Sequence, residues 1–111
     1  MKIAIPSKEK SINSEVESRF GRAKGFVIAD ENKNIIKWID NEENANSASG
    51  AGIQAAQNII NEDADALISM NLGVKSLELL KKYNIELYNL DSETTVENAI
   101  DLLKENKLKK I

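Results

Sequence analysis

The chain has 111 residues, which is room for one hydrophobic core, so we expect residues 1–111 to form a single domain. It contains neither cysteine nor histidine, which excludes disulfides, thiolate or imidazole metal ligands, and the Ser-His-Asp and Cys-His catalytic arrangements. A net charge of −3 disfavours nucleic acid binding. No apolar run reaches the length of a signal peptide or a membrane span, so we expect a cytoplasmic protein without membrane contact.

Apolar runs bounded by turn residues predict three strands in the first part of the chain. Residues 2–5 form the first strand, which ends at Pro6 and lies inside the sheet. Residues 25–29 and 35–39 form a hairpin around the polar turn at residues 30–34.

Two polar stretches are predicted to be loops. Residues 11–24 are expected to form a structured loop, and residues 40–49, rich in Asn, Glu and Ser, a second loop. A loop as long as the second one is commonly functional or mobile in a small domain.

A helix, a strand and a second helix are predicted in the middle of the chain. The first helix begins near Gly50, with Ser47 or Ser49 as its N-cap. Residues 66–70 have the apolar character of a parallel strand covered on both faces, and Asn71 is expected to cap the second helix. The inward face of the first helix is predicted to consist of Ile53, Ala56, Ile59 and Ile60. That of the second helix is predicted to consist of Val74, Leu77, Leu80 and Tyr83.

A further strand and a third helix complete the predicted elements. Residues 85–90 carry polar side chains, which suits an edge strand. Thr94 and Glu97 have the spacing of a capping box at the start of the helix. Its inward stripe is predicted to be Val96, Ala99, Ile100 and Leu103.

The order of these elements predicts an α/β fold with a mixed five-stranded sheet and helices on both faces. The strands at residues 2–5, 66–70 and 85–90 should be parallel at the core of the sheet. Right-handed crossovers between these strands bring several turns to one edge of the sheet, and this edge is the usual ligand-binding crevice of such a fold. The turns expected there are the loop after Ile5, residues 40–49, the Asn71 turn and residues 91–95.

The residues at this edge favour an anionic ligand. Arg19 and Arg22 flank an aromatic residue and a glycine, and a guanidinium binds anions through paired hydrogen bonds. A strand that leads directly into a helix, as at Asn71, leaves backbone N–H groups pointing outward, where anions bind. The glycines and Asn71 would serve equally as plain turns, and Arg22 as a surface residue beside a packed phenylalanine, so both interpretations stay open.

Other common sites are not supported. Neither phosphate-binding fingerprint is present, and the run from Gly73 to Ser76 lacks the spacing of a P-loop. The first strand carries no carboxylate, which disfavours two-metal hydrolysis. Without His or Cys no nucleophile–base pair can be assembled, so we expect no enzymatic activity.

Four motifs follow one another in register along the chain: Phe20-Gly21-Arg22-Ala23, Gly50-Ala51-Gly52-Ile53-Gln54-Ala55-Ala56, Asn71-Leu72-Gly73 and Thr95-Val96-Glu97-Asn98-Ala99-Ile100. Together they resemble the dinitrogenase iron–molybdenum cofactor biosynthesis family, the type of domain found in NifX and at the C-terminus of NifB, over essentially the whole chain. The resemblance implies a three-layer, ribonuclease H-like α/β fold. It also implies binding or carriage of the iron–molybdenum cofactor or its iron–sulfur precursor.

The leading hypothesis is therefore a non-enzymatic metallocluster carrier that has no His or Cys ligand to offer. Its expected partners are the cluster or another small anion, cofactor-assembly proteins and, as a homo-oligomer, further copies of the chain. Two alternatives stay open: a small-anion-binding or regulatory module that has lost the cluster, and an oligomeric interaction domain that uses the hairpin around Trp38. The expected cofactor-binding residues are Arg19, Phe20, Gly21, Arg22, Ser49, Gly50, Gly52, Asn71 and Gly73.

Overall fold

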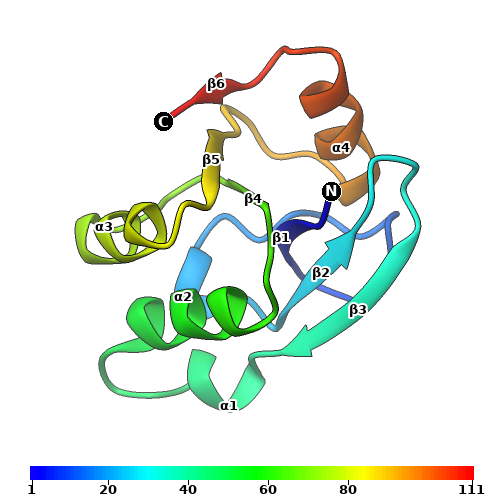
Figure 1. Ribbon diagram of the computed structural model, residues 1–111. Coiled ribbons are helices and arrows are strands. Elements are labelled where there is room, and N and C mark those ends of the chain that lie inside the picture. The colour runs from blue at the N-terminus through cyan, green and yellow to red at the C-terminus, as the bar shows by residue number, and fades with distance from the viewer.

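Six strands form one mixed sheet in the computed structural model, which describes residues 1–111 (Figure 1). In chain order they are β1 (Ile3–Ser7), β2 (Gly25–Ala29), β3 (Ile35–Asp40), β4 (Ala66–Ser69), β5 (Glu86–Asn89) and β6 (Lys109–Lys110). They lie side by side in the order β3-β2-β1-β4-β5-β6. Strands β1, β4 and β5 are parallel, as predicted, and the other pairings are antiparallel. The mixed α/β class is therefore confirmed.

The sheet has one strand more than the five predicted. Strand β6 pairs with the end of β5 and places Lys110 opposite Tyr88, so β5 is not the edge strand that was expected. The amide of Ile111 also donates to the Leu87 carbonyl at 2.8 Å. Two consecutive lysines carry no apolar pattern, and only pairing with β5 makes this segment a strand.

Strand β1 also runs further than predicted, through Pro6 to Ser7. Pro6 lies opposite Phe26 of β2, but β4 pairs only with Ile3 and Ala4. The missing N–H of proline therefore interrupts no hydrogen bond to β4, which explains why the strand tolerates it.

Helices cover both faces of the sheet, as predicted. Helices α2 (Ala51–Asn61) and α3 (Val74–Lys82) lie on one face, and α4 (Val96–Lys104) lies on the other (Figure 1). The two predicted loops contain regular turns: a 3-10 helix η1 (Phe20–Arg22) in the first and a short helix α1 (Glu42–Ala45) in the second. None of the helices has the length and apolar character needed to cross a membrane.

Alternate residues of the central strands point into two separate cores. Phe26 and Leu67 pack beneath α2 and α3, whereas Val27 and Ile68 pack beneath α4. All four side chains are fully buried. The apolar run of β4 thus belongs to a strand covered on both faces, as its sequence predicted.

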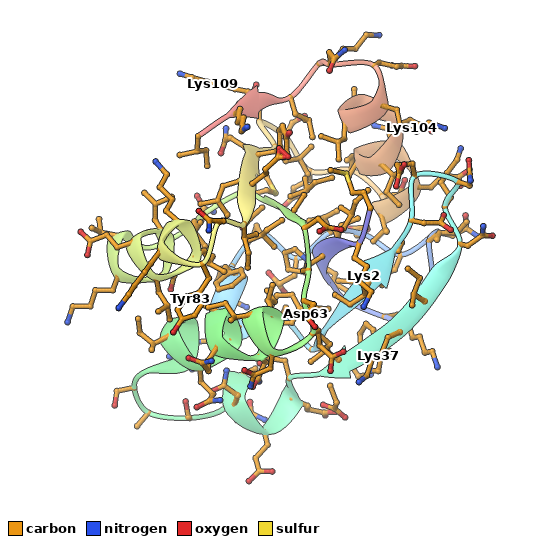
Figure 2. The ribbon with its side chains drawn as sticks, in the orientation of Figure 1. Lys2, Lys37, Asp63, Tyr83, Lys104 and Lys109 are labelled. Carbon is orange, nitrogen blue, oxygen red and sulfur yellow. The ribbon has the colours of Figure 1, made fainter.

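Three residues assigned to inward helix faces are exposed instead. Ile53 is 39 % exposed, Val74 70 % and Tyr83 51 %, and Figure 2 shows Tyr83 near the end of α3. Helix α2 buries Ala51 and Ala55, whose small side chains let it approach its neighbours closely and turn Ile53 toward solvent. The predicted inward residues that are buried are Ala56, Ile59, Leu80, Val96, Ala99 and Ile100.

The start of α4 is capped differently from the prediction. The Thr95 hydroxyl accepts a hydrogen bond from the Asn98 amide at 3.2 Å. The predicted capping box of Thr94 and Glu97 does not form, because the Glu97 amide donates to the Ile12 carbonyl at 2.7 Å. The loop after β1 therefore supplies an acceptor that the local sequence pattern assigned to Thr94.

This loop runs along the edge where β1 and β4 end. The Val16 amide donates to the Thr94 carbonyl at 2.9 Å, beside the start of α4. Further along, the Asn71 side chain donates to the Ser18 carbonyl at 3.0 Å, and Arg19 forms an isolated bridge with Asn71. These bonds hold the predicted turns together at one edge of the sheet.

Candidate functional site

The 3-10 helix η1 and the first turns of α2 and α3 lie against one another at this edge, and two glycines allow this close approach. A Cβ atom on Gly21 of η1 would lie 2.7 Å from the Gly52 amide nitrogen of α2, so the two backbones are in direct contact. A Cβ atom on Gly52 would lie 2.8 Å from Oγ of Ser76 in α3. The absence of side chains therefore brings η1 and the first turns of α2 and α3 together.

The meeting point borders an open cavity of about 390 Å³. Every residue of the predicted site except Ser49 lines it. Ser49 lies outside, in the exposed loop before α2, where its carbonyl accepts a hydrogen bond from the Ser47 hydroxyl at 3.3 Å. The lining residues are Arg19, Phe20, Gly21, Arg22, Gly50, Ala51, Gly52, Asn71, Gly73 and Ser76.

The helices α2 and α3 start at this cavity without side-chain caps. Ser47 and Ser49 do not cap α2, whose N-cap is Gly50 at a left-handed φ of 76°. Asn71 does not cap α3 either, because its side chain donates to the Ser18 carbonyl and the N-cap is Gly73.

As a result, the backbone amides of residues 51–53 and 74–76 have no acceptor within the protein. The N-terminal end of a helix carries a partial positive charge, and two such ends face one cavity here. This arrangement attracts an anion and supplies it with several N–H donors.

Arg22 has a structural role besides its charge. Its Nη1 donates to the carbonyls of Ala45 and Ser47, each at 2.7 Å, and so fastens the loop between α1 and α2. Its other N–H groups make no hydrogen bond within the protein. The guanidinium therefore brings positive charge to the rim of the cavity while it positions the approach to Gly50.

Arg19 is less firmly held than Arg22, whose guanidinium makes two hydrogen bonds of 2.7 Å. Its side chain is 71 % exposed, and its one ionic contact is to Glu17, with Nε 3.7 Å from Oε2. That carboxylate also accepts from the Arg19 amide at 3.1 Å. Because the contact is exposed and long, it holds the guanidinium only weakly, and an anion in the cavity would compete for it.

Two lining residues, Ala51 and Ser76, are absent from the predicted site, and Ser76 is the polar one. It is 5 % exposed, and its hydroxyl makes no hydrogen bond within the protein although it borders the cavity. Ser76 lies one helical turn before the buried Leu80, so it occupies the inward face of α3. That spacing is the signal in the sequence that indicates an inward position for Ser76.

The chemistry of the cavity suits an anion rather than a bare metal ion. No cluster of carboxylates, imidazoles or thiolates able to ligate a metal occurs anywhere in the protein. Two larger hollows, of about 570 and 690 Å³, carry carboxylates and would repel an anion. Their acidic residues are Asp63, Asp65 and Glu86 in the first, and Asp40, Glu42 and Glu43 in the second.

Residues 1–106 match the protein family described as dinitrogenase iron-molybdenum cofactor. The chain belongs to this family. The resemblance seen in its four motifs is thereby confirmed, and the cavity lies between three of them: the Phe20-Gly21-Arg22 run, the glycine-led start of α2 and the Asn71 turn.

Two solved structures show the same fold over nearly the whole chain. The apo form of the orange protein from Desulfovibrio gigas has 28 % sequence identity and a TM-score of 0.91, covering 99 % of this chain and 92 % of that one. A NifB-like protein from Thermotoga, of the DUF35 family, has 33 % identity and a TM-score of 0.82, covering 98 % and 91 %. No curated protein matches this chain.

Proposed function

We propose that this protein binds an anionic metal–sulfur cluster in the cavity between η1, α2 and α3, and carries it without catalysing a reaction. The iron–molybdenum cofactor or its iron–sulfur precursor is the proposed cargo. Membership of the cofactor family supports the chemical class, and the relative from Desulfovibrio gigas was solved in an apo form, which implies a form with a bound group. We also propose a ribonuclease H-like architecture, which the strand order β3-β2-β1-β4-β5 supports.

The observation that carries this proposal is the convergence of two uncapped helix starts on one cavity. Among the free amides of these two helix starts, those of the lining residues Ala51, Gly52 and Ser76 would be donors for sulfide or carboxylate groups at the surface of a cluster. Arg19 and Arg22 add positive charge at the rim. With no protein ligand on the metal, the cluster is held by hydrogen bonds and charge, which is a mode of binding that permits release to a partner.

Anaerobic gel filtration tests the proposal. The protein is incubated with isolated iron–molybdenum cofactor, and molybdenum content and cluster absorbance are followed through the protein peak. We expect both to elute with the protein at about one cluster per chain. A peak free of molybdenum would refute carriage.

A matched pair of variants tests the location. Arg19→Ala removes a cation from the cavity rim, and Lys82→Ala removes one from the exposed far end of α3. Loss of one exposed, charge-assisted contact should weaken retention about three- to tenfold in Arg19→Ala. Lys82→Ala should retain cluster as the parent protein does. Equal losses in the two variants would mean that net charge, and not the cavity, governs binding.

A small-anion-binding or regulatory module is the second candidate, because the same donors serve a phosphate or carboxylate equally well. It predicts binding of such a metabolite with no retention of cluster. The interaction domain around Trp38 has less support. The indole is half-buried and packs directly on the backbone of Gly25, so little of it projects toward a partner.

A further inference from the structure

Ser76 is 5 % exposed as a residue, and its hydroxyl, which reaches the cavity, makes no hydrogen bond within the protein. Serine in a helix commonly bonds back to a carbonyl of the preceding turn, and Ser76 does not. Its Oγ lies only 2.8 Å from the position that a Cβ atom on residue 52 would take, an approach that is possible because Gly52 has no side chain. The hydroxyl therefore stands over the start of α2, beside that helix's free amides, and faces the cavity.

We propose that Ser76 determines which atom of the ligand enters the cavity first, by donating its hydroxyl hydrogen to an oxygen. The inner end of the ligand is then an oxo or carboxylate oxygen, and sulfur atoms lie toward the rim. This inference rests on the proposed function, because it requires an anion in the cavity.

The preference for oxygen follows from the donors that surround the site. An O–H group reaches an oxygen acceptor at about 2.5–3.0 Å, and sulfur is both larger and a weaker acceptor. The arginines lie on other segments and act mainly as charges, so they distinguish less between oxygen and sulfur.

Two probes of the same geometry and charge separate these effects, because each is compared between the unsubstituted chain and the Ser76→Ala variant, so that their difference in size cancels. Molybdate and tetrathiomolybdate are tetrahedral dianions that differ in presenting four oxygens or four sulfurs. Their dissociation constants are measured by anaerobic equilibrium dialysis with molybdenum analysis. The proteins compared are the unsubstituted chain, Ser76→Ala and Lys82→Ala, each checked for its circular dichroism spectrum and thermal midpoint.

We expect Ser76→Ala to weaken molybdate binding about tenfold, the effect of losing one charge-assisted hydrogen bond, and to change tetrathiomolybdate binding less than threefold. Lys82→Ala should leave both constants unchanged. Because tetrathiomolybdate reports on the same cavity in the same variant, loss of folding cannot imitate this result.

Three results would overturn the inference. An equal loss for both probes would show that Ser76 only shapes the cavity, and no change for either would show that it contacts no ligand. If the unsubstituted protein retains cluster in gel filtration but binds neither probe, the inference fails and the proposed function stands. If it retains neither cluster nor probe, the proposed function fails as well.

Discussion

Gly21→Ala should destabilise the protein because Gly21 touches backbone. The new Cβ atom would lie 2.7 Å from the Gly52 nitrogen and 2.9 Å from both the Ala51 carbonyl carbon and the Gly52 Cα. All three atoms belong to the first turn of α2, which cannot rotate aside as a side chain can. The substitution must therefore move η1 away from α2.

The expected loss is about 2 kcal/mol in the free energy of unfolding, the middle of the range for one methyl group forced into a packed site. For a domain of this size, that corresponds to a fall of roughly 10 °C in Tm. Urea titration followed by circular dichroism measures the first quantity, and differential scanning calorimetry the second.

Gly73→Ala is the matched control. A Cβ atom on Gly73 meets nothing within 4 Å, and its φ of −67° suits any residue. Its stability should change by less than about 0.5 kcal/mol. If the two alanine variants lose similar stability, direct contact between η1 and α2 is not what requires glycine at position 21.

Three further predictions concern other parts of the fold. Thr95→Ala should lower the unfolding free energy by about 1 kcal/mol in urea titration, and Thr95→Ser should not, because serine keeps the N-cap acceptor. Hydrogen bonds from the amides of Asn34 and Asn32 hold the pKa of the Asp30 carboxyl below its usual 3.8. The ionised carboxylate therefore stabilises the folded protein above the unfolded pKa, and this stabilisation is lost as the pH falls through the folded pKa. Since Asp30→Asn has no such stabilisation to lose, its free energy of unfolding should fall less than that of the parent protein below about pH 4. Gly25→Ala should shift the fluorescence maximum of Trp38, because the new methyl group displaces the indole; an unchanged spectrum would contradict the packing described.

The central strands could be predicted from the sequence because their unbroken apolar runs match the burial that the structure gives them on both faces. The runs around Ile5 and Leu67 are apolar on both faces, which is the pattern of parallel strands covered by helices on both sides. That the candidate site residues lie together could also be predicted, since the glycines and arginines stand next to helix starts whatever the exact helix boundaries are. Their role in binding an anion stays a prediction.

Features that depend on distant parts of the chain could not be predicted. Ser49 and Asn71 have the residue types of N-caps, but the bond from Asn71 to Ser18 joins positions far apart in sequence. The short strand β6 exists only through its pairing with β5. Ser76 resembled an ordinary polar residue until Gly52 was found packed against it.

The lining of the cavity contains no carboxylate, imidazole, thiol or amine. Its donors are main-chain amides, a hydroxyl, a carboxamide and two guanidinium groups. On the proposed function, therefore, no thiol or imidazole of the protein takes part in unloading. Cargo held there would leave by competition from a receiving protein, or when the loop fastened by Arg22 is pulled away.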